Sequence, residues 1–71
     1  VALKMNLPRD RLESMIALLP SVTAPTIADL YGKPWVSVEI VVDERQVREL
    51  MPRLMQAGAV GIIEFPLNKF V

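Results

Sequence analysis

The residues of this sequence that could hold a small polar molecule gather in one segment, residues 18–27. The segment carries the hydroxyl side chains Ser21, Thr23 and Thr26 and two prolines, Pro20 and Pro25. Loop N–H groups suit a carboxylate, and hydroxyl or carbonyl oxygens suit an ammonium group. The segment therefore has the chemistry to hold a small zwitterion. The same residue types also suit an ordinary helix stop, loop and strand start.

Catalytic and metal chemistry find little support in the sequence. It contains no Cys and no His, which removes the preferred zinc ligands and the Ser-His-Asp and Cys-His arrangements. The carboxylates Asp43, Glu44 and Glu49 suit a capped, solvated helix better than an acid/base pair. The glycines do not have the GxGxxG or GxxxxGK[ST] spacing of a phosphate-binding loop. We expect no catalytic residue, no metal ligand and no cofactor in this domain.

Composition predicts one globular domain without a nucleic-acid or membrane partner. The chain has 71 residues, 52% of them hydrophobic, and eight Lys+Arg balance eight Asp+Glu. Nucleic-acid surfaces need clustered basic residues, and a membrane span needs about 20 apolar residues in a row. No signal peptide is recognisable, and we expect a cytoplasmic protein. Because the sequence opens inside an apolar run without Met, we expect residues 1–71 to be one domain of a longer chain.

Hydrophobic periodicity predicts the element order strand, helix, strand, strand, helix, strand. The strands are expected over residues 1–6, 25–31, 35–42 and 60–65, and the helices over residues 8–19 and 44–57. Pro8 is expected to open the first helix and Pro20 to end it. Asp43 is a natural N-cap of the second helix, and Gly58 is expected to end it. Pro52 lies inside that helix, where we predict a kink rather than two helices.

This order predicts an α+β ferredoxin-like sandwich. Residues 32–34 are too few for a crossover, so the strands on either side form a hairpin. Two right-handed helical crossovers then give a four-stranded antiparallel sheet in the order 4-1-3-2, with both helices on one face. The core face of the third strand is expected to carry Val36, Val38, Ile40 and Val42. The opposite face of the sheet has no helix to cover it.

The uncovered sheet face is predicted to be an interface. Ala2, Lys4 and Asn6 are expected on its first strand, and Trp35, Ser37, Glu39 and Val41 on its third. Apolar residues such as Trp35 and Val41 are unusual on a face meant for water. We therefore expect another subunit or domain to cover the face, with Trp35, Ser37 and Val41 in the oligomer interface. The alternative is a few scattered exposed hydrophobes, which are common on small proteins.

An ordered set of segments resembles the C-terminal regulatory domain of long-form ATP phosphoribosyltransferase. The segments are LPSVTAPTI at residues 19–27, WV at 35–36, VRELMPRL at 47–54, AGA at 57–59, II at 62–63 and FPLNK at 65–69. The resemblance covers essentially the whole chain and implies a fold like that of ACT and PII-type domains. It implies a non-catalytic domain of an enzyme that joins ATP to phosphoribosyl pyrophosphate with magnesium. That reaction is the first step of histidine biosynthesis, and the resemblance places its catalytic domains earlier in the chain.

The resemblance also implies that the domain binds L-histidine, mediates feedback inhibition and contributes to a hexamer. By matching position, the histidine contacts would be Asn6, Val22, Thr26, Val41 and Gly61. Asn6 and Thr26 would supply polar contacts, the two valines apolar walls, and Gly61 a close approach to the backbone. Some family members have an acidic residue where this chain has Asn6, so an ion pair with the ligand ammonium is lost there. Two alternatives stay open: an oligomerisation module without a live ligand site, and a stand-alone small-molecule sensor of ACT or PII type.

Overall fold

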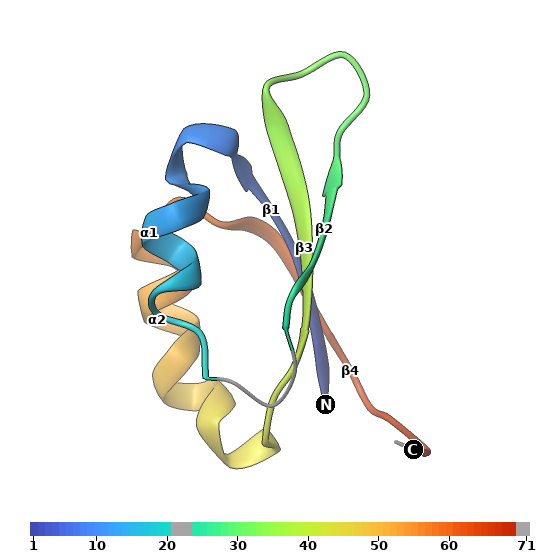
Figure 1. Ribbon diagram of the computed structural model, residues 1–71. Helices are drawn as coiled ribbons and strands as arrows, with labels where there is room; N and C mark the ends of the chain where they lie inside the picture. The colour runs from blue at the N-terminus through green and yellow to red at the C-terminus, as the bar shows by residue number, and fades with distance from the viewer. Residues whose placement is uncertain (21–23, 70–71) are drawn as a thin grey trace.

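The computed structural model describes residues 1–20 and 24–69. Its elements are β1 (Ala2–Pro8), η1 (Arg9–Arg11), α1 (Leu12–Ile16), β2 (Thr26–Asp29), β3 (Trp35–Val41), η2 (Glu44–Gln46), α2 (Val47–Gln56) and β4 (Val60–Phe65). The strands form one antiparallel sheet in the order β2-β3-β1-β4. Both helices lie against the same face of that sheet (Figure 1). The predicted ferredoxin-like sandwich and its strand order are confirmed.

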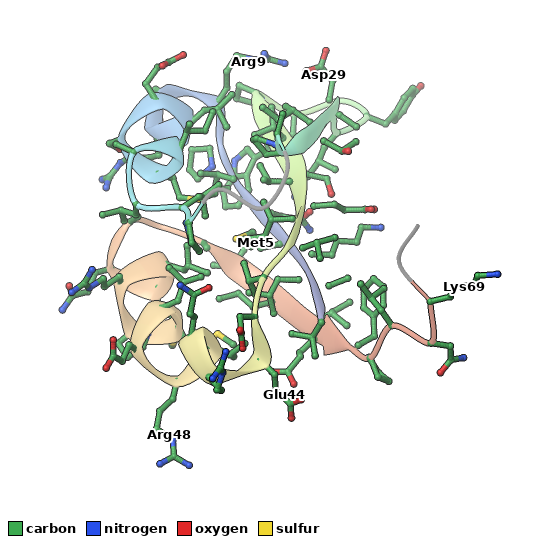
Figure 2. The ribbon with its side chains drawn as sticks, turned by 60° about the horizontal axis from the view of Figure 1, so that its bottom comes forward. Met5, Arg9, Asp29, Glu44, Arg48 and Lys69 are labelled. Atoms are coloured by element: carbon green, nitrogen blue, oxygen red, sulfur yellow. The ribbon has the colours of Figure 1, made fainter. Side chains whose placement is uncertain are left out.

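Cross-strand pairs between β1 and β3 build the centre of the core. The pairs are Leu3–Ile40, Met5–Val38 and Leu7–Val36, and all six side chains are buried. The predicted core face of the third strand is therefore confirmed, and Figure 2 marks Met5 within the sandwich. The first strand ends two residues later than predicted, because Leu7 continues its alternation into the core.

The first helix is shorter than predicted, and Pro8 does not belong to it. Pro8 ends β1 with an extended backbone, φ −60° and ψ 141°, because its ring restrains φ and leaves ψ free. The α-helical part ends at Ile16, not at residue 19. The N–H groups of Leu18 and Leu19 bond to carbonyls only three residues back, which tightens the chain into turns. Met15 still anchors the helix, since its side chain is fully buried.

The start of the second helix has the predicted cap. The Asp43 side chain accepts a hydrogen bond from the backbone N–H of Arg45 at 2.9 Å, and the cap opens the 3₁₀ turn η2 rather than α2 directly. The Arg45 guanidinium folds back onto the same carboxylate at 2.8 Å. The helix then continues through Pro52 as one element, as predicted. Pro52 and Arg48, whose carbonyl lacks its usual N–H partner, both lie on the exposed side, where water can replace the missing bond.

The Asp43 cap makes stability depend on pH at the acid end. The hydrogen bond from the Arg45 side chain, with a second from its backbone N–H, lowers the pKa of Asp43 from 3.8 to about 2. The stabilisation is therefore fully present above pH 3.8 and is lost as the pH falls through about 2. We expect Asp43→Asn to lower the thermal midpoint at pH 7 and to reduce the drop in midpoint between pH 4 and pH 2.

The control for this prediction is Asp10→Asn. The Asp10 carboxylate is exposed and has no hydrogen-bond partner among residues 1–20 and 24–69. Thermal melts of both variants at a series of pH values provide the comparison. If the thermal midpoint of Asp43→Asn depends on pH as that of the unmodified protein does, the cap does not contribute to stability.

The end of the second helix is a Schellman motif. Gly58 has φ +102°, and its N–H bonds to the Met55 carbonyl at 3.1 Å. The next N–H, of Ala59, bonds to the Leu54 carbonyl at 3.0 Å. These two bonds satisfy carbonyls that the helix end leaves free, and the positive φ favours glycine. The predicted stop at Gly58 is confirmed.

The second strand is shorter than predicted and lies at one edge of the sheet. It covers Thr26–Asp29 rather than residues 25–31, and all four residues are exposed. Beyond it, the N–H of Leu30 bonds to the Trp35 carbonyl at 3.0 Å, and Gly32 turns the hairpin with φ +71°. Asp29 forms an ion pair with Arg9 at the same end of the molecule (Figure 2). The predicted antiparallel hairpin is confirmed.

The fourth strand contains a bulge that the sequence did not reveal. It pairs with β1, and the register shifts between Lys4 and Asn6. Two residues of β4, Gly61 and Ile62, lie opposite one residue of β1, Met5. Gly61 has φ +61°. Glycine in this left-handed conformation is the mark of a G1 bulge. The bulge keeps Ile62 against the core while the residues on both sides of it face the uncovered surface.

Candidate functional site

The uncovered face of the sheet is organised in cross-strand rows. From one end to the other, the rows are Phe65–Ala2–Val41, Ile63–Lys4–Glu39–Thr26, Val60–Asn6–Ser37–Ala28 and Pro8–Trp35. Polar side chains occupy the centre of this face, on β1 and β3. Apolar side chains occupy its β4 margin. The face therefore has a polar centre beside an apolar border.

Asn6 and Gly61 lie side by side on this face. A Cβ atom added to Gly61 would come 3.8 Å from Asn6 Nδ2. Asn6 is half-buried, and its side-chain amide has no hydrogen-bond partner among the described residues. Because Gly61 has no side chain, the Asn6 amide stays accessible above the bulge. Two of the predicted histidine contacts are thus neighbours.

Thr26 and Val41 form a second group on the same face. Both line a shallow hollow of about 100 Å³, together with Ala2, Ala24, Glu39 and Ile40. Thr26 is exposed on the edge strand, and Val41 is half-buried near the end of β3. The hollow combines a hydroxyl, a carboxylate and apolar walls, which suits a small polar ligand.

The two groups lie one row apart. Thr26 is in the row of Lys4 and Glu39, whereas Asn6 is in the next row. Thr26 on β2 and Asn6 on β1 are separated by β3, but Glu39 of the hollow is a diagonal neighbour of Asn6. Diagonal neighbours on adjacent strands are about 7–8 Å apart, so a molecule the size of an amino acid could reach from Glu39 to Asn6. Val22, the fifth predicted contact, lies outside the described residues.

The predicted interface residues lie on the uncovered face. This face also carries exposed apolar side chains that the sequence did not assign to it. Trp35, Ser37 and Val41 are all half-buried there. The margin along β4 adds Val60, Ile63 and Phe65, which are 51%, 55% and 39% exposed. Simple alternation could not assign them to this face, because the bulge shifts the register in the middle of the strand. A glycine inside a strand pattern was the available signal for the bulge.

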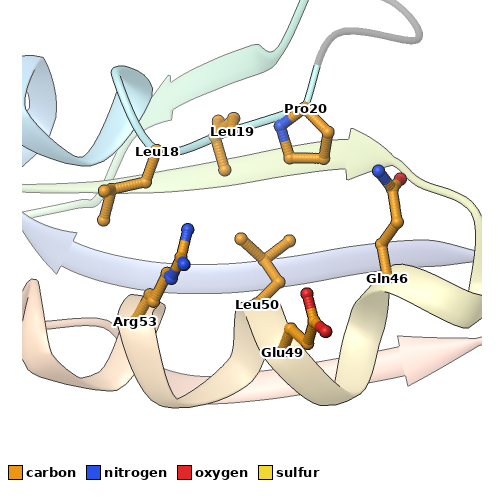
Figure 3. A pocket seen from close by; sticks show the side chains of 7 residues that line it. All are labelled: Leu18, Leu19, Pro20, Gln46, Glu49, Leu50 and Arg53. Carbon is orange, nitrogen blue, oxygen red and sulfur yellow. The ribbon is translucent and has the colours of Figure 1, made fainter.

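A groove on the helix side contains none of the predicted contacts. It has a volume of about 190 Å³ and lies between the chain after α1 and the exposed side of α2 (Figure 3). Its lining residues are Leu18, Leu19, Pro20, Gln46, Glu49, Leu50 and Arg53. Across residues 1–20 and 24–69, no group of three or more His, Cys, Asp and Glu side chains could hold a metal ion.

Within the same described ranges, no helix has the length and apolar character needed to cross a bilayer.

Comparison with known proteins identifies the family. Residues 1–69 match the family described as "HisG, C-terminal domain". Over all 71 residues, the chain is 58% identical to an ATP phosphoribosyltransferase of Solidesulfovibrio magneticus and 49% identical to one of Thermodesulfovibrio yellowstonii. It is 52% identical, over the same 71 residues, to an ATP phosphoribosyltransferase of Pelotomaculum thermopropionicum.

The chain spans about a quarter of the length of these curated relatives, 24% of the first two and 25% of the third. The match extends across all four strands and both helices of the sandwich. The chain belongs to the family of HisG C-terminal domains.

Proposed function

We propose that this domain is the regulatory part of an ATP phosphoribosyltransferase and binds L-histidine on the uncovered face of its sheet. The family match and the names of the relatives support the assignment to that enzyme. The observation that carries the proposed site is the neighbouring arrangement of Asn6 and Gly61, 3.8 Å apart as measured to a Cβ added at Gly61. A half-buried amide beside a strand position without a side chain leaves room for a ligand next to a hydrogen-bonding group.

In this proposal the two groups of residues contact different parts of the ligand. The Asn6 amide and the Thr26 hydroxyl supply directed hydrogen bonds, and Val41 supplies an apolar wall, as Val22 would. Gly61 lets the ligand approach the backbone of β4. The face is shallow, so a second copy of the chain, resting on the apolar margin of β4, is proposed to close the site.

Regulation then follows from a difference in affinity. The ATP phosphoribosyltransferase reaction with phosphoribosyl pyrophosphate and magnesium is proposed to take place in catalytic domains of the same chain. Histidine lowers that activity if it binds one arrangement of a homo-oligomer, proposed to be a hexamer, more tightly than another. Such coupling is typically worth about 1–3 kcal/mol.

Thr26→Val tests the proposal, because it removes the hydroxyl and conserves the shape. A neutral hydrogen bond is worth about 0.5–1.5 kcal/mol, so we expect histidine inhibition to weaken by roughly two- to tenfold. The measurement is the histidine concentration that halves ATP phosphoribosyltransferase turnover of the full-length enzyme. Ser14→Ala is the control, since Ser14 lies on α1 and its hydroxyl bonds, among the described residues, only to the Arg11 carbonyl at 3.0 Å.

The possible outcomes distinguish an error in the assigned site residues from an error in the proposed function. Equal inhibition of Thr26→Val and the unmodified enzyme would remove Thr26 from the site. An unmodified enzyme that turns over and does not respond to histidine would overturn the feedback role. The domain would then be an oligomerisation module, which the apolar margin of the uncovered face favours.

A further inference from the structure

Two opposite charges meet at the centre of the uncovered face. Lys4 on β1 lies directly opposite Glu39 on β3. Both side chains are exposed. They are the only charged residues among the strand positions that the register assigns to this face. A cation and an anion are therefore held side by side within a surface that is otherwise neutral.

Among the described residues, neither charge has an ion-pair partner. Among residues 1–20 and 24–69, the ion pairs within 4.0 Å are Arg9–Asp29 and Arg45–Asp43 only. An exposed pair contributes little to stability even when it forms. A ligand that takes one charge from each side chain therefore displaces little existing interaction.

Glu39 also belongs to the hollow that contains two of the proposed histidine contacts. Glu39 lines that hollow with Thr26 and Val41. Asn6 is a diagonal neighbour of Glu39 across β1 and β3 and lies about 7–8 Å away. A ligand head group at Glu39 could thus extend its side chain toward Asn6 and Gly61.

We propose that Glu39 and Lys4 bind the two charged groups shared by free α-amino acids. The Glu39 carboxylate accepts hydrogen bonds from the ligand α-ammonium, and the Lys4 ammonium donates to the ligand carboxylate. This inference rests on the proposed function and adds the residues that recognise the head group. Glu39 would supply a negative charge for the ligand ammonium, which the neutral Asn6 of this chain does not.

The inference divides recognition between two places on the face. The Lys4–Glu39 pair recognises any α-amino acid, because it contacts only the head group. In this arrangement Glu39 takes the contact with the ammonium that the resemblance assigns to the position of Asn6. Selection of the imidazole ring then falls to the neighbouring group of Asn6 and Gly61. Substitution of Glu39 should therefore weaken the binding of ligands that have an α-ammonium group and spare ligands that lack it.

The test pairs protein variants with ligands that lack one charge. Calorimetry on the full-length enzyme would measure dissociation constants for L-histidine, for imidazole-4-propionate, which lacks the ammonium, and for histamine, which lacks the carboxylate. Glu39→Gln should weaken L-histidine binding by roughly ten- to a hundredfold, as expected for a charge-assisted hydrogen bond. It should leave the affinity for imidazole-4-propionate unchanged or higher. Lys4→Gln should weaken L-histidine binding similarly and spare histamine.

Glu64→Gln is the matched control. Glu64 is exposed on β4 opposite Leu3, whose side chain points into the core, so its register assigns it to the helix side. We expect this variant to bind L-histidine as the unmodified enzyme does. Thermal midpoints of all three variants would establish that the fold is intact.

The failures of the two proposals can be distinguished. If the unmodified enzyme does not bind L-histidine, the proposed function fails and this inference fails with it. If it binds L-histidine and Glu39→Gln binds equally well, the histidine site stands and the head-group assignment is overturned. A variant that weakens L-histidine and imidazole-4-propionate to the same degree would also overturn it, because Glu39 would then act without contacting the ammonium.

Discussion

A full-length enzyme carrying Gly61→Val is expected to turn over without any measurable inhibition by L-histidine. Gly61 has φ +61°, where a β-branched residue is a strong outlier. Its Cβ would lie 3.8 Å from Asn6 Nδ2, and the two methyl groups beyond it would crowd the same amide. Left-handed backbone also costs a non-glycine residue about 1–2 kcal/mol. The substitution therefore combines strain in the bulge with a blocked approach to Asn6.

Gly32→Val separates these two effects. Gly32 has a similar φ of +71°, and no heavy atom lies within 4 Å of a Cβ added there. It shares the backbone strain but lies in the β2–β3 turn, away from Asn6. We expect Gly32→Val to lower the thermal midpoint and keep histidine inhibition. Inhibition lost equally in both variants would mean that strain alone, rather than a ligand beside Gly61, controls regulation.

Ile63→Asp is expected to break the proposed homo-oligomer into smaller species. Ile63 is 55% exposed in the middle of the apolar margin, between Val60 and Phe65. A carboxylate buried there against a second copy would lose water without gaining a partner. Hot-spot residues near the centre of an interface contribute about 2 kcal/mol or more. If Ile63 is one of them, its loss raises the dissociation constant of the assembly at least roughly thirtyfold. Sedimentation velocity of the full-length enzyme over a range of concentrations is the measurement.

The matched control is Ile27→Asp. Ile27 is 40% exposed, and its partner across the strands is Val38, whose side chain points into the core. Ile27 therefore lies on the helix side of the sheet edge, away from the uncovered face. We expect this variant to sediment like the unmodified enzyme. Unchanged sedimentation of Ile63→Asp would mean that the β4 margin does not carry the assembly.

The architecture could be predicted because its signals are local and repeated. Alternating valines and isoleucine marked the core face of β3, and Asp43 and Gly58 marked the ends of the second helical segment through their backbone hydrogen bonds. Each signal depends on side-chain period or capping chemistry within a few residues. The strand order then followed from connection lengths and the handedness of crossovers.

The errors fall where a residue type permits two conformations. Pro8 fits the first position of a helix, yet its φ fits an extended strand end equally well. Gly61 was recognised as a position for close approach, but the sequence did not show that its positive φ makes a bulge. That bulge brings Gly61 beside Asn6 and turns Val60 and Ile63 toward the uncovered face. Such placements depend on the pairing partner, which is distant in sequence.

The site itself was only partly accessible to sequence reasoning. Thr26 stood out by its hydroxyl, whereas Glu39 was only placed on the uncovered face and given no role in binding. The role proposed for Glu39 depends on the register that sets it opposite Lys4 and beside the hollow. No pattern along a single strand contains that information.

Both edges of the sheet are built to resist growth into fibres. An edge strand exposes unpaired N–H and C=O groups that can recruit further chains. Here β2 is only four residues long and ends on the charged Asp29, which is paired with Arg9. At the other edge, the bulge at Gly61 interrupts the regular ladder of β4. A domain with an apolar margin on its open sheet face can therefore associate through that face into a closed assembly, while strand-by-strand polymerisation is discouraged.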